Sequence, residues 1–324
     1  MKLPLAPYSD LLEREIHAMQ FGKQPLTLYE PIRYMMRLGG KRIRPMLTLL
    51  AYSLFKGNVK DIVPYAAAVE VFHNFTLMHD DIMDKAPLRR GKPTIHEKWN
   101  LSTAILSGDV MLVKVYEVFS RLEPATFKVT VRSFNACATQ VCEGQQWDMH
   151  FENASRVSEA EYIQMIRSKT AALLGFSLEL GAILADTSEN DRKLLREFGI
   201  CIGIGFQLKD DLLDAYGDPE KFGKQIGGDI IANKKTFLLI KALEKAGPAE
   251  KRELKNWMLA ARFNKRKKVE AVIRIYDKLK VPNHSQRKAD QYFAKAFRLL
   301  DLFPESPAKE SLRAFTRMLI DRQN

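Results

Sequence analysis

The sequence predicts an all-α protein, and three observations carry this prediction. Apolar residues recur at three- and four-residue spacing along most of the chain, which is typical of helices with one buried face. Runs in which apolar and polar residues strictly alternate are scarce. Residues 129–131 (Val-Thr-Val) are the only candidate for the start of a strand. No Pro-rich or Gly/Ser-rich linker divides the 324 residues. We therefore expect one helical domain over residues 1–324, with little or no sheet.

Helical periodicity is clearest in four segments. These are residues 11–19, 65–84, 104–119 and 195–216. Pro64 stands where the first turn of the second segment would open, and Pro87, Gly91 and Pro93 break regular structure after it. The acidic residues at the end of that segment should therefore close a helix that opens into a loop. Residues 223–233 are too few to be more than a loop between helices.

Composition excludes several classes of protein. A chain with 46% hydrophobic and 28% charged residues has the mixture of a globular protein and not that of a disordered one. Three cysteines without a CxxC pair indicate neither a disulfide framework nor a zinc site, which favours a cytoplasmic location. The most apolar stretch, residues 171–185, carries Glu179 and is too short to span a bilayer. The net charge of +12 favours acidic partners such as phosphates, nucleic acid or an anionic membrane face.

Two acidic clusters share one spacing, with aspartates at positions i, i+1 and i+4 of an apolar helical segment. They comprise Asp80, Asp81 and Asp84, and Asp210, Asp211 and Asp214. Like charges one helical turn apart repel each other unless a cation lies between them. One such cluster could be a charged helix end, but two chance copies are improbable. Carboxylates without neighbouring His or Cys favour Mg²⁺, which binds one or two carboxylates together with substrate phosphates. We expect a substrate that is a diphosphate or a triphosphate.

Basic residues gather beside the acidic clusters. They comprise Lys41, Arg42, Arg44, Arg89, Arg90, Lys169, Lys224, Lys234 and Lys235. Each alone would be a solvated surface charge, but together they indicate phosphate binding. The GxxxxGK[ST] phosphate loop is missing, so nucleotide hydrolysis has no support. A further basic run, residues 265–268, is either a solvated helix face or part of a nucleic-acid-binding surface.

The motifs in their order resemble those of the trans-type isoprenyl diphosphate synthases, also called polyprenyl synthetases. The resemblance rests on GGKRIRP at 39–45, HDDIMDKAPLRRGKPT at 79–94, SGD at 107–109, EGQQWDM at 143–149, KT at 169–170, FQLKDDLLD at 206–214, GKQIGGDI at 223–230 and NKKT at 233–236. The doubled DDxxD, the first followed by RRG, is highly specific. No motif matches after about residue 245. The resemblance implies a helical bundle of the isoprenoid synthase type around a central active-site cavity, and a homodimer.

The resemblance also implies roles for individual residues. Asp80, Asp84 and Asp210 would ligate three Mg²⁺ ions, with Asp81, Asp211 and Asp214 supporting them. The allylic diphosphate would be held by Arg89, Lys169, Lys224 and Lys234. The diphosphate of isopentenyl diphosphate would be held by Lys41, Arg44, His73 and Arg90. Thr170 and Gln207 would face the reacting carbons. For His73, a plain core histidine on an apolar helix remains the alternative.

The implied reaction breaks an allylic carbon–oxygen bond, after which the double bond of isopentenyl diphosphate attacks. Phe75 occupies the fifth position before the first DDxxD, where the family places aromatic residues in enzymes with short products. Thr76 at the fourth position departs from the animal-type farnesyl enzymes, and the bacterial two-residue insertion is missing. Both departures favour a C20 product over C15. Five helical steps rotate Phe75 by about 140° from Asp80, so simple core packing is the alternative.

Three competing functions remain. A class I terpene cyclase also carries a DDxxD, but its second metal motif differs from the one at 210–214, and it would have no use for GGKRIRP. A basic helical nucleic-acid-binding protein would use residues 265–268 with Trp257 and Phe263, and would leave the paired aspartates unexplained. An inactive regulatory subunit of the same family is disfavoured because both aspartate motifs are intact.

Overall fold

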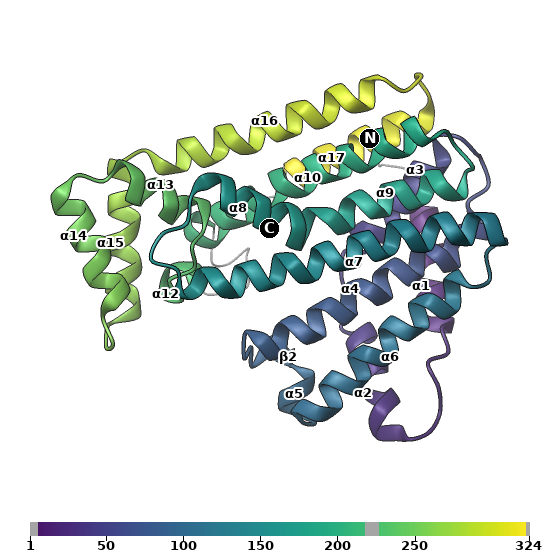
Figure 1. Ribbon diagram of the computed structural model, residues 1–324, viewed down its shortest axis with the longest axis horizontal. Coiled ribbons are helices and arrows are strands. Elements are labelled where there is room, and N and C mark those ends of the chain that lie inside the picture. The colour runs from purple at the N-terminus through teal and green to yellow at the C-terminus, as the bar shows by residue number, and fades with distance from the viewer. Residues whose placement is uncertain (1–5, 218–226, 322–324) are drawn as a thin grey trace. The chain divides into compact units, whose positions relative to one another are not determined.

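The computed structural model describes residues 6–217 and 227–321, and its regular structure is almost entirely helical (Figure 1). Within these residues the strands are β1 (Leu88–Arg89) and β2 (Lys92–Pro93), which pair as a short antiparallel hairpin. The all-α prediction is confirmed. Lys224, which we expected to hold a diphosphate, lies outside the described residues.

The chain divides into two compact units, which we describe separately. Unit 1 consists of Met1–Ala138, Leu173–Arg196 and Phe303–Ala314, and unit 2 of Thr139–Ala172, Glu197–Leu302 and Phe315–Asn324. Each unit draws on segments that are far apart in the sequence. The prediction of a single domain over the whole chain stays a prediction.

Unit 1 contains six helices near the N-terminus together with parts of four later ones. They are α1 (Ala6–Ala18), α2 (Leu26–Arg37), α3 (Ile43–Ser53), α4 (Val63–Met83), α5 (Ile95–Lys98) and α6 (Leu101–Phe119), a 3₁₀ turn (Lys60–Ile62), the first half of α7 (Pro124–Asn153), most of α9 (Ala172–Leu184) and the beginnings of α10 (Glu189–Tyr216) and α17 (Pro307–Ile320). Helix α4 packs against α3 and α6 (Figure 1). The ring of Phe134 lies at the centre of an aromatic core, with ring centroids of Phe72, Phe119 and Phe176 at 4.9, 5.4 and 5.6 Å. This core holds the helix that carries the first aspartate motif.

Helix α4 begins and ends as the sequence indicates. Pro64 stands in its first turn, where a missing N–H leaves no hydrogen bond unmade. At its end Lys85 adopts a left-handed conformation (φ 49°), and the amide of Ala86 donates to the carbonyl of Asp81 at 2.9 Å. This is a Schellman motif, which closes a helix by satisfying its last carbonyls. Arg90 and Gly91, both with positive φ, then form the turn of the hairpin.

Residues 129–131, the one candidate strand nucleus in the sequence, lie inside the 30-residue helix α7, in agreement with the expectation of little or no sheet. β-branched side chains only weakly oppose a helix, and burial of neighbours such as Phe134 outweighs that preference. The stretch 223–233, expected to be loop, contains the short helix α12 (Gly228–Ile231) among its described residues.

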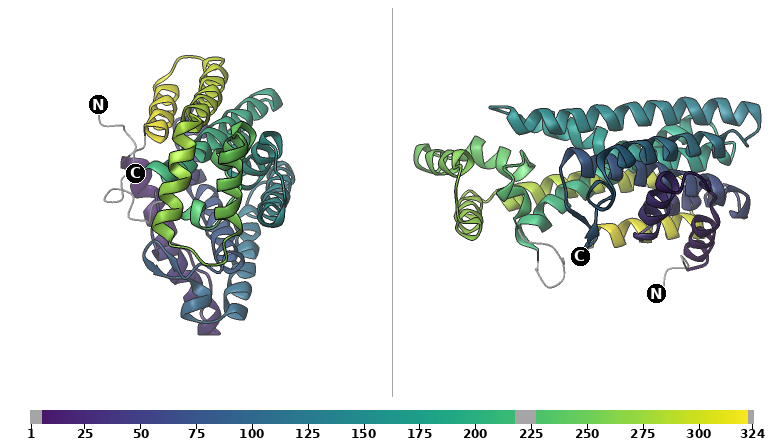
Figure 2. Two further views of the ribbon diagram at one scale, coloured as in Figure 1. Left: turned by 90° about the vertical axis from the view of Figure 1, so that its left-hand side faces the viewer. Right: turned by 90° about the horizontal axis from the view of Figure 1, so that it is seen from below.

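Unit 2 contains the remaining helices. They are the second half of α7, α8 (Glu159–Ile166), a π-helical turn (Arg167–Ala171), most of α10, α12, α13 (Phe237–Lys245), α14 (Pro248–Leu259), α15 (Lys265–Lys278), α16 (Val281–Asp301) and the end of α17. Helices α14 and α15 run side by side (Figure 2). Leu254, Val272 and Tyr276 on these helices form an apolar core with Leu238 and Leu239 of α13. The region after residue 245, which matches no motif, therefore builds core that supports α13.

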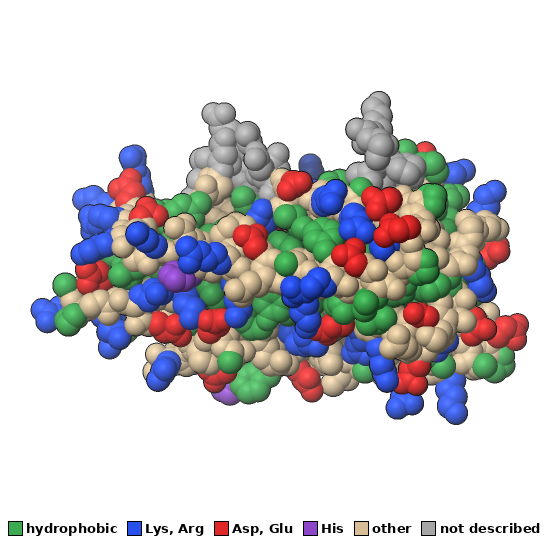
Figure 3. Space-filling model, turned by 90° about the horizontal axis from the view of Figure 1, so that it is seen from above, with side chains coloured by type: hydrophobic (Ala, Val, Ile, Leu, Met, Phe, Trp, Pro, Cys, Tyr) green, Lys and Arg blue, Asp and Glu red, His purple; other side chains and the backbone are tan. Residues whose placement is uncertain are grey.

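None of the helices in the described part of the chain is long and apolar enough to cross a membrane, which confirms that expectation. The cytoplasmic location stays a prediction. On the face displayed in Figure 3, Lys and Arg side chains are interspersed with Asp and Glu side chains. The net positive charge therefore does not form one continuous basic surface on that face.

Candidate active site

The first aspartate motif lies at the C-terminal end of α4 in unit 1. Asp80 and Asp84 are one helical turn apart, whereas Asp81 is buried. The carboxylate of Asp81 accepts from Arg89 of the hairpin, with Nε–Oδ1 2.9 Å and Nη2–Oδ1 2.7 Å. A paired carboxylate contributes little charge to a metal, so Asp81 serves to fasten the hairpin and Arg89 to α4. Its supporting role at a metal stays a prediction.

The GGKRIRP loop assembles two different arginine environments. Arg42 is buried and pairs with Glu13 and Glu70, each at 2.9 Å, so it fixes the loop and is not available to a substrate. Arg44, two residues later, donates from Nη1 to Nε2 of His73 at 3.1 Å. The Nε atom of Arg44 is buried and has no hydrogen-bond partner within the described residues. A buried unpaired donor on a guanidinium is suited to an anionic ligand.

His73 therefore stands beside a cation and not simply in an apolar core. Burial, followed by the charge of Arg44, lowers the pKa of His73 well below its usual value. The imidazole is then neutral at pH 7, and its Nε2 can accept from Arg44. Arg90 reaches the same loop and donates to the carbonyl of Gly39. A Cβ on Gly40 would lie 3.0 Å from Arg90, so a glycine permits this approach. Lys41 is exposed beside them.

The two predicted chain-length residues lie on α4 as well. The ring of Phe75 packs against His79 and Phe72, with centroid distances of 4.7 and 5.6 Å, and is half-buried. The hydroxyl of Thr76 donates to the carbonyl of His73 at 2.8 Å. The partial exposure of Phe75 is compatible with a wall residue as well as with packing.

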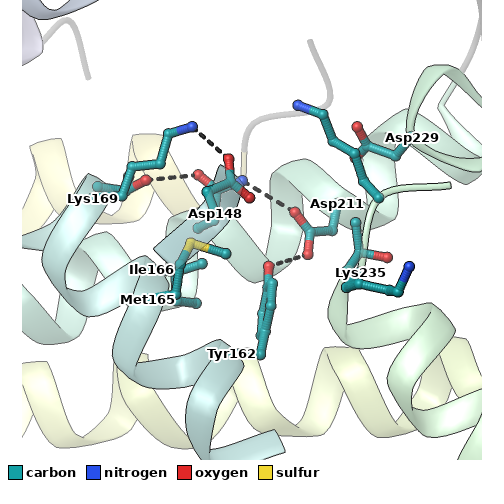
Figure 4. A pocket seen from close by; sticks show the side chains of 12 residues that line it. Asp148, Tyr162, Met165, Ile166, Lys169, Asp211, Asp229 and Lys235 are labelled. Carbon is teal, nitrogen blue, oxygen red and sulfur yellow. Dashed lines mark hydrogen bonds and ion pairs between the residues drawn. The ribbon is translucent and has the colours of Figure 1, made fainter. Parts of the chain in front are cut away.

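Unit 2 contains an open cavity that holds several of the predicted residues (Figure 4). Its lining comprises Asp148, Tyr162, Met165, Ile166, Lys169, Thr170, Gln207, Asp211, Asp229, Lys234, Lys235 and Thr236. Three lysines thus lie around the same cavity as three aspartates. Such a lining is suited to a phosphate-bearing ligand with bound cations.

Lys169 and Thr170 are presented by the π-helical turn that joins α8 to α9. The ammonium of Lys169 pairs with Asp148 at 2.6 Å, and Figure 4 shows the two side chains pointing toward one another. A Cβ on Gly144 of α7 would lie 2.2 Å from the backbone nitrogen of Lys169. Only glycine lets α7 come this close, which explains why Gly144 and Asp148 stand one turn apart in the EGQQWDM motif.

A chain of hydrogen bonds connects the predicted reaction-facing residues to the second aspartate motif. Thr170 donates to Gln207 at 3.0 Å, and Gln207 donates to Asp211 at 3.1 Å. The other oxygen of Asp211 accepts from the hydroxyl of Tyr162 (Figure 4). Burial, and then the charge of Asp229, raises the pKa of Asp211 to about 8. The hydrogen bonds from Thr170 to Gln207, from Gln207 to Asp211 and from Tyr162 to Asp211 hold Gln207 and Thr170 in one orientation.

The other members of the second motif lie on the same helix. Asp210 is half-buried beside Asp211. Asp214 accepts from the amide of Asp229 at 2.9 Å and so holds the start of α12. The carbonyl of Asp229 in turn accepts from the amide of Lys234 at 2.9 Å. Asp214 thus holds α12, which precedes the lysines, and its supporting role at a metal stays a prediction.

The polar cavity residues that were missed in the sequence are Asp148, Tyr162 and Asp229. Asp148 and Asp229 stand in two of the motifs given above. Asp148 follows Gly144 by one helical turn and Asp229 directly follows Gly228, and these glycines were a usable signal. Tyr162 has no local signal, because its apolar helical spacing is that of a core residue. Its partner Asp211 lies 49 positions away, so only the fold brings them together.

A scan against family models matches residues 25–276 to the polyprenyl synthetase model. The chain belongs to the polyprenyl synthetase family. It is 44% identical to the short chain isoprenyl diphosphate synthase of Methanocaldococcus jannaschii over 70% of this chain and 69% of the relative. The crystal structure of a geranylgeranyl pyrophosphate synthetase from Pyrococcus horikoshii is similar with a TM-score of 0.91 at 33% identity, covering 98% of this chain and 96% of that one.

A more distant polyprenyl synthetase also bears on the metal. The polyprenyl synthase of Caulobacter crescentus, crystallised with calcium and isoprenyl diphosphate, has a TM-score of 0.86 at 26% identity, covering 99% of this chain and 95% of that one. This polyprenyl synthetase is thus an isoprenyl diphosphate synthase, a trans-prenyltransferase, from a family that binds divalent metal with diphosphate. The family predicted from the motifs is confirmed. Neither the cyclase nor the nucleic-acid-binding alternative gains support.

Proposed function

We propose that this synthase joins isopentenyl diphosphate head-to-tail to dimethylallyl, geranyl or farnesyl diphosphate and releases C20 geranylgeranyl diphosphate as its main product. The observation that carries the proposal is the cavity of unit 2, where Lys169 and Lys234 lie with Asp211 and its hydrogen-bonded partners. The name of the Pyrococcus horikoshii relative supports the C20 product. C15 farnesyl diphosphate is the alternative product.

The two diphosphates have separate groups of cations in this proposal. Lys169, Lys234 and Arg89, with Lys224, bind the allylic diphosphate. Arg44, whose buried Nε lacks a partner within the described residues, binds the diphosphate of isopentenyl diphosphate with Lys41, His73 and Arg90. Guanidinium groups match diphosphate oxygens through paired N–H donors. Fixed cations of this kind orient both substrates before the reaction.

The donor set fits Mg²⁺. Asp80 and Asp84 in unit 1 and Asp210 in unit 2 are carboxylates, which are ligands that hard cations prefer. No three His, Cys, Asp or Glu side chains converge on one point within residues 6–217 and 227–321, which suits ions that take further ligands from diphosphate and water. We propose that these three aspartates hold three Mg²⁺ ions. Bound Mg²⁺ supplies positive charge that stabilises the departing diphosphate.

The chain's own residues orient the reacting carbons and shield them from water. Gln207 and Thr170, connected by a hydrogen bond of 3.0 Å, face the carbons that join. Met165 and Ile166 give the cavity an apolar wall that excludes water from the allylic cation. The departing diphosphate, held by the lysines, accepts the proton lost after the new carbon–carbon bond forms. No side chain is needed as a dedicated base.

The proposal is tested by incubating the protein with Mg²⁺, isopentenyl diphosphate and each of the three allylic diphosphates in turn. Products are dephosphorylated and their chain lengths are measured by chromatography. We expect C20 as the main product from each primer. C15 as the main end product would contradict the product length, and no condensation with any primer would contradict the function.

The assignment of the isopentenyl diphosphate site predicts a selective change in Michaelis constant. Arg44→Ala should raise the KM for isopentenyl diphosphate by on the order of tenfold to a hundredfold, and Lys41→Ala by less, because Lys41 is exposed and its charge is screened. The KM for the allylic substrate should change little. Lys128→Ala, an exposed lysine on α7, serves as the control. An unchanged KM for isopentenyl diphosphate in Arg44→Ala would contradict the assignment.

We also propose a homodimer, which the resemblance implies and which an apolar face of α6 supports. Leu106 and Val113 are seven residues apart, so they lie on one face of α6, and they are 58% and 62% exposed. Introducing arginine at both positions should convert the dimer to monomer in sedimentation velocity. Leu302→Arg, at an apolar residue 65% exposed in unit 2, should leave the dimer intact. A wild-type protein that sediments as a monomer would contradict the proposal.

A further inference from the structure

The basic run at residues 265–268 divides into two environments. Lys265, Arg266 and Lys267 are exposed on the first turn of α15. Lys268 is only 1% exposed. Its ammonium donates to the carbonyl of Ile231 at 3.1 Å and to Oδ1 of Asn233 at 2.7 Å. One lysine of the run is thus directed inward, to the end of α12.

The segment that Lys268 contacts is the one that carries cavity lysines. Residues 232–236 join α12 to α13, and Asn233 adopts a left-handed conformation (φ 57°) there. The amide of Asn233 also donates from Nδ2 to the carbonyl of Met258 on α14 at 3.0 Å. The next residues, Lys234 and Lys235, line the cavity. Lys268 and Asn233 therefore fix the backbone immediately before these two lysines.

Packing alone does not account for a lysine at this position. Lys268 lines a small pocket together with Leu254, Val272, Tyr276 and Asp229, and its ammonium lies 4.2 Å from the centroid of the Phe263 ring. Within the described residues its hydrogen-bond acceptors are neutral oxygens, and none of the recorded ion pairs includes it. A buried ammonium that forms no ion pair is costly, and methionine could fill the same space. What the ammonium adds is two directed hydrogen bonds to the segment before Lys234.

We infer that Lys268 is a positioning residue for the allylic diphosphate site, which it serves by holding residues 231–233 so that Lys234 points into the cavity. The inference rests on the proposed function in one respect, namely that Lys234 binds the allylic diphosphate. Lys268 itself contacts no substrate in this proposal. Its effect should therefore appear in substrate affinity and in the rigidity of the segment.

The experiment compares Lys268→Met with Lys267→Met, its exposed neighbour in the same run. In the ligand-free protein, Lys268→Met should accelerate hydrogen exchange of the backbone amides of Asn233 and Lys234, which donate to Ile230 and Asp229. The KM for the allylic diphosphate should rise by about tenfold, the KM for isopentenyl diphosphate should stay within about twofold, and kcat should fall less than the KM rises. Lys267→Met should match the wild type in each measurement.

Two outcomes would overturn the inference. One is unchanged exchange at residues 233–234 in Lys268→Met. The other is faster exchange, or a lower melting temperature, with both KM values unchanged, which would make Lys268 a merely structural residue. Lys234→Ala is measured alongside: if it leaves the allylic KM unchanged, the assignment of Lys234 under the proposed function fails, whereas the exchange data still judge the contact made by Lys268.

A second variant tests the inference even if Lys268→Met does not fold. Asn233→Gly preserves the left-handed backbone but removes the amide that joins Lys268 to Met258. It should raise the allylic KM in the same direction and by less, because the hydrogen bond from Lys268 to Ile231 is retained. In the double variant the two effects should not add, since both residues belong to one hydrogen-bond network. Additive effects would overturn the inference.

Discussion

Asp80→Ala and Asp210→Ala should each lower kcat by on the order of 10³-fold or more while leaving the helical content unchanged. Each substitution removes a carboxylate proposed to hold Mg²⁺ against the departing diphosphate. That interaction strengthens only as the carbon–oxygen bond breaks, so the loss should fall on kcat more than on either KM. Steady-state kinetics at saturating Mg²⁺ with circular dichroism measure both quantities.

Matched controls for these variants come from exposed aspartates in the same units. Asp61→Ala in unit 1 and Asp290→Ala in unit 2 remove a negative charge of the same size away from either motif. Both should retain activity within about twofold of the wild type, since surface charges contribute little. Rates near the wild-type value for Asp80→Ala or Asp210→Ala would reject the assignment of the metal ligands.

Phe75→Ala should change the identity of the main product, lengthening it by at least one isoprene unit. Phe75 stands five residues before Asp80, about 7–8 Å along the helix, so its half-buried ring is in reach of a growing chain that starts at the diphosphate. Removing the ring opens space without altering any proposed ligand of the metal. Chain-length analysis of dephosphorylated products, with farnesyl diphosphate as primer, measures the change.

The contacts of Phe75 define what a negative result would mean. Its ring packs on Phe72 and His79, so truncation could also loosen α4 and slow the reaction. Phe55→Ala, which removes an aromatic ring from a different contact in unit 1, should leave product length unchanged. If Phe75→Ala gave the wild-type length at a reduced rate, Phe75 would be a packing residue and the limit on chain length would lie on another helix.

The helices were predictable wherever one face is buried along the whole element. Pro64 and the sequence after Asp84 marked both ends of α4 because proline and left-handed residues act locally. The helix at residues 129–131 could not be predicted from local preference. Intrinsic preference for strand is a weak local effect, and the packing of α7 around Phe134 depends on residues far away in the sequence.

The candidate site was predictable in its composition but not in its connections. The repeated aspartate spacing singled out Asp80 and Asp210 as candidate metal ligands, because carboxylates that share a cation lie one turn apart on a helix. Arg42 and Arg44 look alike in the sequence, yet one is paired with Glu13 and Glu70 and the other contacts His73. Lys267 and Lys268 are likewise adjacent and have opposite environments. Such differences depend on which side of a helix meets a partner, and one sequence does not specify that partner.

The π-helical turn at Arg167–Ala171 makes this part of the chain intolerant of a change in length. A π turn is an α-helix with one extra residue, so deleting a single residue there would restore a regular helix. The helices on either side of the turn would keep nearly their present orientation, but the residues within the turn would each move by one position. Lys169 and Thr170 could not both keep their bonds to Asp148 and Gln207. Natural variation and protein engineering should therefore allow substitutions in this turn far more readily than single-residue deletions.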